Sequence, residues 1–526
     1  MSTTHLTTPG EELVPPGAPH RGNEDRKLLE MLWGDWRVGF AIAVAVPAVF
    51  ALISAWLAPR GPLTTSQALG SMVIALAVGL VAGMVTASRW SLLIAPVVFT
   101  IVFEIARVGT VGLTVDGIQL GSFYGITAFV LGRVVPGVLV LIPMILGARY
   151  GVVLAGRLGH EAAPSMGIGG WIITGLASVL LVAIGYFLVI PATTAAIPGA
   201  DGEPLPGSVA ELAAVTIGGG EQVMMIRGRS IDNPVLLYLA GIPGGTDLGA
   251  MRSDTTLEQD FVVATWDRRG SGKSYPALDP TDTFTLDQEV ADTIEVTNYL
   301  RDRFDEDKIY LVGQSGGTTI GGLAVQQRPE LFHAMVGVGQ MVSQRETDVM
   351  FWEDTLAWAE ETGQSDLAET LRDYGPPPYE DIRRYEAAVF GHEHDWNPYP
   401  EFDAGNEMPA ILFVPEYAWM DRINAFRGVL DVFVVQYPQL QDLDFRRDLT
   451  SLEVPFYMVL GEHEARGRAV PANEWFQMLD APVKERVIVP GSGHRPNFDQ
   501  PGMFAELMAQ VLDQTSSAPI AEAGSE

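Results

Sequence analysis

Residues 311–320 read LVGQSGGTTI, an apolar run that ends in a serine placed between glycines. This pattern is typical of a buried strand that turns sharply into a helix. Small neighbours allow the strand and the helix to approach each other, and the turn raises the hydroxyl of Ser315 over the sheet. The N-terminus of the following helix favours a developing negative charge. The stretch therefore predicts that Ser315 is a nucleophile.

The sequence on either side of Ser315 alternates between short apolar runs and helical patterns. Such alternation predicts a mostly parallel sheet covered by helices on both faces, with reactive groups at the carboxyl ends of the strands. Two long helical patterns cover 286–303, with Thr285 as N-cap, and 317–327. The predicted strands are 210–216, 222–228, 234–239, 261–266, 309–313, 334–339, 455–460 and 486–490.

A serine nucleophile needs a base, and in sheets of this kind the order along the chain is serine, acid, histidine. Of the eight histidines, only His494 lies beyond the last strand end that carries acids, directly after the strand 486–490. The acid is expected in the loop GEHEARGRAVP (461–471), which offers Glu462 and Glu464 but no Asp. We favour Glu464 over Glu462 as the carboxylate that orients His494 and stabilises its protonated form.

An oxyanion hole requires two backbone N–H groups near the nucleophile. One is expected from Gly316 and the other from the loop AGIPGG (240–245), most simply from Ile242. Gly241 and Gln314 are expected to line the substrate site beside them.

The first 200 residues have a different composition, with ten Lys and Arg, nine Asp and Glu, and long uncharged runs. Each run is near the roughly 20 residues that a bilayer requires. The first run lacks a small-residue cleavage site and is interpreted as an anchor. Gly79 and Gly83 form a GxxxG pair, which indicates close helix packing. We predict five membrane spans, at about 38–58, 69–87, 90–108, 125–148 and 170–193.

Short-loop Lys and Arg predict the orientation of the spans, because cytoplasmic loops are enriched in them. The N-terminal tail, the second loop and the fourth loop carry these residues, whereas the alternate loops carry only Arg60. Five spans then place the N-terminus in the cytoplasm and the remainder of the chain outside the cell membrane. Glu104, Arg107 and Arg133 lie in or beside apolar runs and are expected to form an internal ion pair or, alternatively, a polar site.

The charge of the chain limits its partners. The net charge is −31 and nearly all of it lies beyond residue 200, with only four Lys in the whole chain. Nucleic acids and anionic lipid surfaces attract Lys and Arg clusters, so neither is expected as a partner. The chain has no Cys, which excludes disulfides and thiol nucleophiles. The predicted organisation is a disordered cytoplasmic tail (1–36), a transmembrane domain (37–194), a linker (195–208), a core in two parts (209–340 and 451–513), a helical cap (341–450) and a disordered tail (514–526).

Four motifs together resemble the proline iminopeptidase branch of the α/β-hydrolase superfamily: AGIPGG (240–245), WDRRGSGKS (266–274), GQSGG (313–317) and GSGH (491–494). The resemblance covers about 205–513 and implies an α/β-hydrolase fold with a helical cap. The chain departs from the family pattern in Ala240, which replaces a His, in Ile242, which replaces a Gly, and in the use of Glu as the acid. These departures leave serine hydrolysis intact and the substrate open.

In that family, carboxylates of the cap capture the free amine of the substrate. The resemblance therefore implies an amine-binding role for acids near the start of the cap, and the candidates by position are Glu346, Asp348, Glu353 and Asp354.

Two other patterns resemble ligand sites. GKS (272–274) mimics the end of a phosphate-binding loop, but Asp267 stands where the first glycine would be, so no nucleotide is expected. His392 to Asp395 contain metal-ligating residue types without a further partner at a known spacing. We therefore expect no metal and no cofactor.

Three functions remain open from the sequence. The leading interpretation is a membrane-anchored serine hydrolase that releases N-terminal residues from small peptides or amides through an acyl-enzyme. The second keeps this chemistry but changes the substrate to an ester, a lipid or a xenobiotic. The third is a transporter or sensor with a non-catalytic, hydrolase-like binding domain.

Overall fold

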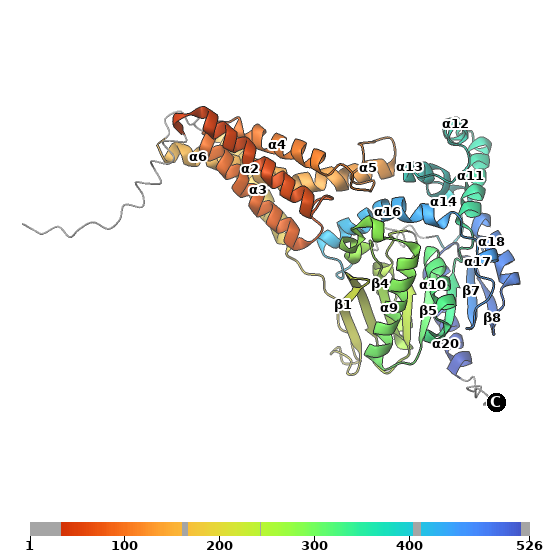
Figure 1. The fold of residues 1–526 in the computed structure, drawn as a ribbon. Helices are drawn as coiled ribbons and strands as arrows, with labels where there is room; N and C mark the ends of the chain where they lie inside the picture. Colours follow the sequence, from red (N-terminus) through yellow and green to blue (C-terminus); the bar gives the residue numbers. More distant parts are fainter. Residues whose placement is uncertain (1–32, 160–166, 242, 403–411, 517–526) are drawn as a thin grey trace, which may run out of the picture. The chain divides into compact units, whose positions relative to one another are not determined.

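The computed structural model describes residues 33–159, 167–241, 243–402 and 412–516 (Figure 1). Ile242 and most of the two predicted tails, residues 1–32 and 517–526, lie outside the described residues. The described residues form two compact units. The helical unit is drawn from Met1–Ser54, Met72–Ala106 and Val140–Leu181, and the sheet unit from Ala55–Ser71, Arg107–Leu139 and Val182–Glu526. The segment 55–71, most of which lies between the first two predicted spans, and the segment 107–139, which includes the first part of the predicted span 125–148, thus group with the sheet.

Helices occupy all five ranges predicted to span a membrane. In the part of the chain that the structure describes, four helices are long and apolar enough to cross a bilayer: Trp36–Leu57, Thr65–Thr86, Phe123–Arg157 and Ile168–Leu188. The fifth, Ser91–Ala106, has 16 residues and is shorter than the others. The elements are α2 (Trp36–Leu57), α3 (Thr65–Thr86), α4 (Ser91–Ala106), α5 (Phe123–Phe129), η1 (Val130–Val134), α6 (Val135–Arg157) and α7 (Ile168–Leu188).

Glycines bring α3 and α6 into backbone contact within the helical unit. A Cβ on Gly79 would lie 1.9 Å from the carbonyl oxygen of Met144, and a Cβ on Gly83 would lie 2.1 Å from that of Ala148. The GxxxG pair therefore packs as expected, since any side chain there would separate the two helices.

Arg107 and Arg133 hold the backbone between helices in the sheet unit. Arg107 is buried and donates to the carbonyls of Pro59 and Gly132. Arg133 lies in a π-helical turn and donates to the carbonyls of Val115 and Asp116, the latter at 2.7 Å. The ion pair of these residues with Glu104 stays a prediction.

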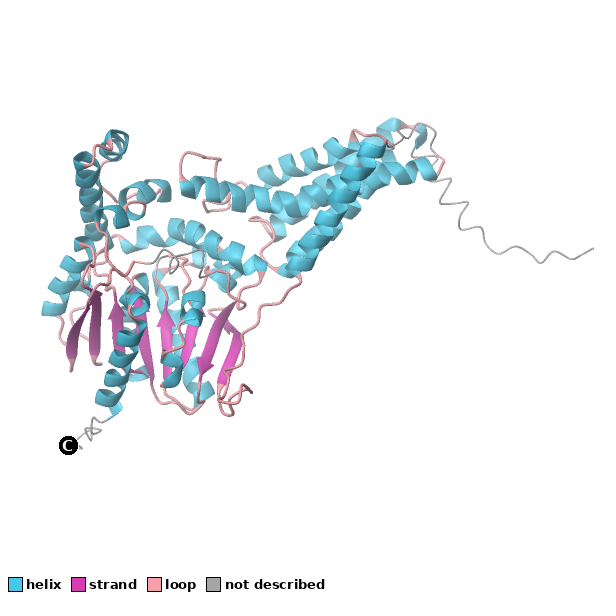
Figure 2. Ribbon diagram, turned by 180° about the vertical axis from the view of Figure 1, so that it is seen from behind, coloured by secondary structure: helices cyan, strands magenta, loops and turns pink. Residues whose placement is uncertain are grey.

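The described part of the sheet unit contains one eight-stranded sheet, in the order β1-β2-β4-β3-β5-β6-β7-β8 (Figure 2). Strands β3 to β8 pair in parallel, whereas β1 and β2 are antiparallel to each other and β2 is antiparallel to β4. All residues of β3, β5 and β7 are buried, which explains their uninterrupted apolar sequences. The strands are β1 (Val209–Ile217), β2 (Gly220–Gly228), β3 (Val235–Leu239), β4 (Val262–Asp267), β5 (Ile309–Gln314), β6 (Phe332–Val338), β7 (Phe456–Gly461) and β8 (Lys484–Val489).

Helices cover both faces of the sheet, as the alternating pattern predicts. One face packs against α9 (Leu286–Phe304), α10 (Gly316–Gln327) and α18 (Arg466–Met478), and the other against α8 (Leu248–Ser253) and α20 (Pro501–Ser516). Thr285 is the N-cap of α9, where its hydroxyl accepts from the amide of Gln288 at 3.1 Å. The short helix α19 (Pro496–Asp499) precedes α20.

Between β6 and β7 the chain forms a group of helices instead of continuing the sheet (Figure 1). These helices share a core that includes Phe351, Leu371, Tyr385 and Phe433. They correspond to the predicted cap and comprise α11 (Gln344–Glu361), α12 (Ser365–Tyr374), α13 (Ile382–Tyr385), η6 (Glu386–Phe390), α14 (Glu393–Trp396), α16 (Trp419–Leu440) and α17 (Phe445–Asp448).

Candidate active site

Ser315 forms a tight turn between β5 and α10. Its backbone has φ of 50° and ψ of −121°, a conformation that a residue with a side chain rarely adopts. Glycines make this turn possible, since a Cβ on Gly313 would lie 2.7 Å from the carbonyl oxygen of Gly317, and one on Gly317 would lie 2.3 Å from that of Leu239. The strained serine is thus held at the carboxyl end of the central strand, which is where a nucleophile is useful.

Ser315, His494 and Glu464 form a continuous hydrogen-bonded chain. Ser315 Oγ lies 2.9 Å from His494 Nε2, and His494 Nδ1 lies 2.9 Å from Glu464 Oε2. An ionised carboxylate accepts hydrogen bonds only, so Nδ1 carries the proton and Nε2 of the neutral ring is left to accept from the serine hydroxyl. The geometry is that of a nucleophile, its base and the group that orients the base.

The second oxygen of Glu464 is held by Arg468. Arg468 Nε donates to Glu464 Oε1 at 2.7 Å, and the Arg468 guanidinium also pairs with Glu393 of α14. Burial alone acts to raise the pKa of the Glu464 carboxyl, but the charges of His494 and Arg468 and their hydrogen bonds outweigh it and lower the pKa to about 2. The carboxylate beneath His494 is therefore ionised throughout the neutral range.

Glu462, the alternative acid, lies elsewhere. Its side chain is 57% exposed, and its carboxylate accepts from the amide of Gly491 at 2.9 Å. The structure brings Glu464, and not Glu462, to His494. Glu464 is the third residue after Gly461, where β7 ends, so its position follows from the turn rather than from the acid itself.

The loop after β3 lies against the nucleophile. A Cβ on Gly241 would lie 2.4 Å from Gln314 Oε1 and 2.9 Å from Ser315 Cβ, so only glycine fits there. Gly316 is the first residue of α10, where backbone N–H groups have no partner within the helix. These positions suit an oxyanion hole, although the other expected donor, Ile242, lies outside the described residues.

Arg268 also binds the loop after β3. It is buried and donates to the carbonyl of Ala240 at 3.1 Å, and its other terminal nitrogen pairs with Glu289 of α9 at 3.1 Å. Sequence reasoning found this residue only as part of a motif and gave it no task.

The remainder of the motif 266–274 is structural. Asp267 is buried and accepts from the amide of Lys273 at 2.8 Å and from the hydroxyls of Thr246 and Tyr417. Burial raises the pKa of Asp267 to about 6 against these hydrogen bonds. Lys273 Nζ pairs with Asp421 of α16 at 2.5 Å. The lysine of the GKS sequence thus bonds to protein groups.

The four cap acids proposed by position all have protein partners. Glu346 pairs with Arg446, whereas Glu353 and Asp354 both pair with Arg466. Asp348 is buried and accepts from the hydroxyls of Tyr437 and Tyr385. Burial raises the pKa of Asp348 to about 7, although these hydrogen bonds oppose the shift. Their predicted contact with substrate stays a prediction.

The tract from His392 to Asp395 is occupied by protein contacts. His392 Nδ1 lies 3.0 Å from Asp395 Oδ2, Glu393 pairs with Arg468, and His394 stacks on Phe402. Among the residues that the structure describes, no group of three or more His, Cys, Asp or Glu is arranged to hold a metal ion.

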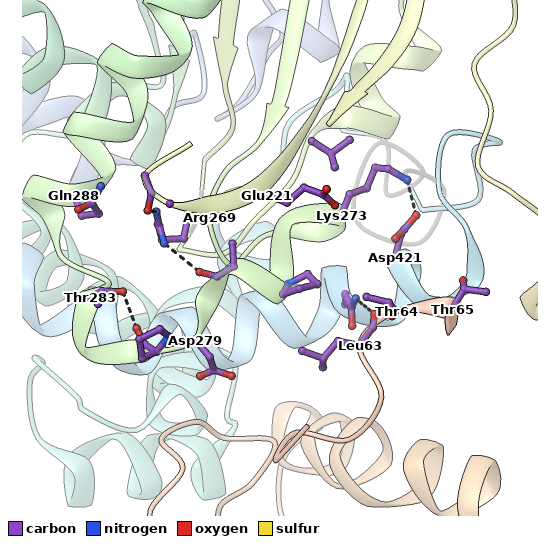
Figure 3. Close-up of a pocket in the computed structure, with 18 residues that line it drawn as sticks. Leu63, Thr64, Thr65, Glu221, Arg269, Lys273, Asp279, Thr283, Gln288 and Asp421 are labelled. Carbon is purple, nitrogen blue, oxygen red and sulfur yellow. Dashed lines mark hydrogen bonds and ion pairs between the residues drawn. The ribbon is translucent and has the colours of Figure 1, made fainter. Parts of the chain in front are cut away.

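A separate pocket of about 580 Å³ lies in the sheet unit, beside the turn that joins β1 and β2 (Figure 3). Leu63 and Thr64 line one part of it, and Lys273, Arg269 and Asp421 line others. The described residues of its wall do not include the serine, histidine or glutamate of the hydrogen-bonded chain.

Comparison with protein families identifies the fold of the sheet unit. Residues 234–501, just over half of the chain, match the alpha/beta hydrolase fold family. The chain therefore belongs to the alpha/beta hydrolase family. The match confirms the predicted fold class, and it begins at β3, after the two antiparallel strands.

Other proteins are similar to more than half of this alpha/beta hydrolase. A Bacillus subtilis protein named as a probable aminopeptidase, YbaC, is 29% identical over 321 residues, which is 58% of this chain and 98% of that protein. The structure of a proline iminopeptidase-related protein from Thermus thermophilus is 21% identical and covers 58% of this chain and 98% of its own, with a TM-score of 0.42. That of a bacterial membrane phospholipase A is 20% identical and covers 66% and 99%, with a TM-score of 0.43.

Two residues of this alpha/beta hydrolase's site escaped the sequence analysis. Arg468 lies four residues after Glu464 on the first turn of α18, a spacing that favours a side-chain ion pair and could have suggested the contact. Glu393 lies 75 residues from Arg468 in the sequence, and no local pattern links them.

Proposed function

We propose that this alpha/beta hydrolase is a membrane-anchored serine hydrolase that releases N-terminal residues from small peptides or amides. The observation that carries the proposal is the unbroken chain from Ser315 through His494 to Glu464, with both contacts of His494 at 2.9 Å. A binding module has no need of a hydroxyl, an imidazole and a buried carboxylate in this order.

The reaction follows from the positions of these groups. Ser315 Oγ attacks the substrate carbonyl carbon while His494 Nε2 takes the hydroxyl proton. The carbonyl oxygen becomes an oxyanion, which the amides of Gly316 and Ile242 stabilise. His494 then gives its proton to the leaving amine, the C–N bond breaks and an acyl-serine ester remains. Water, activated by the same imidazole, hydrolyses that ester and restores the serine.

The amide substrate class is supported by the similarity to the Bacillus subtilis protein, which covers 98% of that protein's length. For an aminopeptidase, a carboxylate of the cap must hold the amine of the substrate. Glu346 and Glu353 are proposed for this task, with Asp348 and Asp354 as alternatives. Each would have to exchange the protein partner that it has in this structure for the substrate amine.

Anchoring is supported by the four helices that are long and apolar enough to cross a bilayer. Many of their apolar side chains are exposed, such as Val179 at 69% and Val182 at 73% on α7. The excess of Lys and Arg in the N-terminal tail and in the second and fourth loops favours a cytoplasmic N-terminus and a hydrolase outside the cell membrane.

The test is covalent labelling of the full-length purified protein with a fluorophosphonate probe, with Ser315→Ala as the control. Labelling that is lost in Ser315→Ala supports the nucleophile. Release assays on proline-, alanine- and ester-linked chromogenic substrates then separate amide from ester hydrolysis, and turnover of esters alone would replace the peptidase proposal by an esterase or lipid hydrolase. A folded wild type that does not label would contradict catalysis and favour a binding role.

A further inference from the structure

The helix α16 carries a buried carboxylate, Asp431, that accepts most of its hydrogen bonds from residues outside the family-matched region. Asp431 is fully buried and accepts from Arg60 Nη1 at 3.1 Å, from the hydroxyl of Thr114 at 2.7 Å and from the hydroxyl of Tyr275 at 2.6 Å. The amide of Thr114 donates to the other oxygen at 2.9 Å. Arg60 and Thr114 each lie between predicted spans, in the segments 55–71 and 107–139 that group with the sheet unit.

Arg60 is itself fully buried and makes further contacts in the same place. Its Nε and Nη2 pair with Asp279 at 3.0 and 3.1 Å, and Nη2 donates to the carbonyl of Val111 at 2.6 Å. A Cβ on Gly112 would lie 2.4 Å from Arg60 Nη1 and 2.7 Å from Asp431 Oδ1, so the chain can pass here only as glycine.

Two more side chains of α16 bind the same segments. Arg427 is buried and donates to the carbonyls of Pro62 at 2.8 Å and Leu131 at 3.0 Å. Asn424 donates to the carbonyl of Leu63 at 2.7 Å, beside the pocket of Figure 3. Leu113, Ala128 and Leu131 belong to the hydrophobic core of the cap itself. These segments are therefore part of the cap, although they lie more than 100 residues before the family match.

The same face of α16 also packs on the loops that follow β3 and β4. A Cβ on Gly428 would lie 2.8 Å from the carbonyl oxygen of Gly244 and 2.6 Å from that of Gly270, so the helix backbone packs directly on both loops. Gly244 lies in the loop after β3 that also contains Gly241, the neighbour of Ser315. Gln436, further along α16, bonds to Glu289, which pairs with the Arg268 that holds the carbonyl of Ala240.

We infer that residues 58–64 and 111–131 complete the active site by fixing α16, and that Arg60 and Asp431 are positioning residues for the loop after β3. Without Arg60 and Thr114, Asp431 would keep only the hydroxyl of Tyr275 as a hydrogen-bond donor, and α16 would have to shift to hydrate the carboxylate. A shift of α16 moves the loop that carries the oxyanion-hole amide. The inference rests on the proposed serine hydrolase function, because it assigns that loop a catalytic task.

The experiment compares full-length Arg60→Met, Asp431→Asn and the double variant with wild type. The readouts are the rate constant of fluorophosphonate labelling, kcat and KM on the best chromogenic substrate, and amide hydrogen exchange of the peptide 243–252. We expect labelling and kcat to fall by on the order of 10- to 100-fold in each single variant, because small displacements of catalytic groups have effects of this size. KM should change by less than about threefold, since an oxyanion hole acts on the transition state.

Exchange of 243–252 should be faster in Arg60→Met, while exchange of β7 stays unchanged. The double variant should be no worse than the worse single variant, because Asp431 is then uncharged and Asp279, the other partner of Arg60, is 36% exposed to water. Arg303→Met is the matched control: it breaks an ion pair with Glu211, 2.6 Å apart and partly exposed, on a part of the sheet unit away from α16. It should behave as wild type.

Wild-type labelling and wild-type exchange of 243–252 in Arg60→Met would overturn the inference. If Arg60→Met does not fold, Arg60→Lys keeps the charge and loses the planar fork, and it should show the same effects to a smaller degree. Failure of the proposed function is read separately: a wild type that does not label sinks the serine nucleophile, whereas the exchange of 243–252 still reports whether Arg60 positions the loop.

Discussion

Arg468 and Glu464 share one hydrogen bond of 2.7 Å between the arginine Nε and the carboxylate oxygen that does not face His494. Glu464 is thereby held at both oxygens, by a cation on one side and by the imidazole on the other. A glutamate has one more methylene than the aspartate that is usual at this position in the family. Arg468 removes the freedom that this methylene would give.

We expect Arg468→Gln to lower kcat by on the order of 10- to 100-fold, because Glu464 is no longer fixed beneath His494. Arg468→Lys keeps the positive charge but loses the planar guanidinium, so its kcat should lie between those of Arg468→Gln and wild type. Steady-state kinetics on the substrate found by the release assays measure both. Equal activity of Arg468→Gln and wild type would contradict a positioning role.

The same substitution should change the acid stability of the protein. The pKa of Glu464 is lowered in the folded state to about 2, so its contribution to stability is present above the ordinary value of 4.5 and is lost as the pH falls towards 2. Removing Arg468 raises this pKa, so stability should be lost at higher pH. Unfolding midpoints between about pH 2 and 5, with Arg303→Met as the control, test the shift.

The choice between the two acids of the loop is tested by Glu464→Gln and Glu462→Gln. An amide at 464 can donate to Nδ1 and so favours the wrong tautomer of His494, which should lower kcat by about 10³- to 10⁴-fold. Glu462 is mostly exposed and bonds to the amide of Gly491, so its substitution should leave kcat within about threefold of wild type. The reverse result would assign the role to Glu462.

Gly241→Ala tests the contact between the loop after β3 and the nucleophile. The added Cβ would meet Ser315 Cβ at 2.9 Å, and neither backbone can move without disturbing the turn at Ser315. We expect a loss of about 100-fold in the labelling rate with the fold retained by circular dichroism. Gly502→Ala on α20, where nothing lies within 4 Å of the added atom, is the control. An unchanged labelling rate in Gly241→Ala would place the loop further from the reaction.

The orientation of the spans can be measured because the chain has no Cys. Single cysteines at Ser365, exposed on α12, and at Leu158, exposed after α6, report the two predicted sides. On intact cells, an impermeant maleimide should label Ser365→Cys, and should label Leu158→Cys only after lysis. Labelling of Leu158→Cys alone on intact cells would reverse the orientation.

The sequence predicted the sheet well because its strands β3, β4, β5 and β7 are buried on both faces and have mostly apolar sequences. Strands β1 to β8 lie at the predicted ranges to within two residues. Ser315 and His494 could also be predicted from the sequence. Each directly follows a strand and has glycine neighbours, so the local sequence shows a tight turn at that residue. Glu464 could be predicted from the order serine, acid, histidine along the chain, which places the acid in the loop after β7.

What the sequence could not provide depends on contacts between distant residues. The pairing of Arg468 with Glu393 joins α18 to α14, 75 residues apart in the sequence, and the four cap acids predicted by position have arginine or tyrosine partners. The segments around Arg60 and Thr114 were read only as loops between spans. The polar side chains of these segments are buried against α16 one residue at a time, outside helices and strands. Their burial therefore produces no periodic pattern in the sequence.

The bond between Arg60 and Asp431 joins residues 371 positions apart, and that between Thr114 and Asp431 joins residues 317 positions apart. During synthesis the segments that contain Arg60 and Thr114 leave the ribosome long before α16. These two donors therefore have no Asp431 to bind until α16 has been made. Contacts of such separation form slowly, since a long loop must close before they contribute. Strands β1 to β6 are made before α16, so the contacts that fix α16 form only after most of the sheet has been synthesised. A nascent chain cannot pair Arg60 and Thr114 with Asp431 until residue 431 has been synthesised.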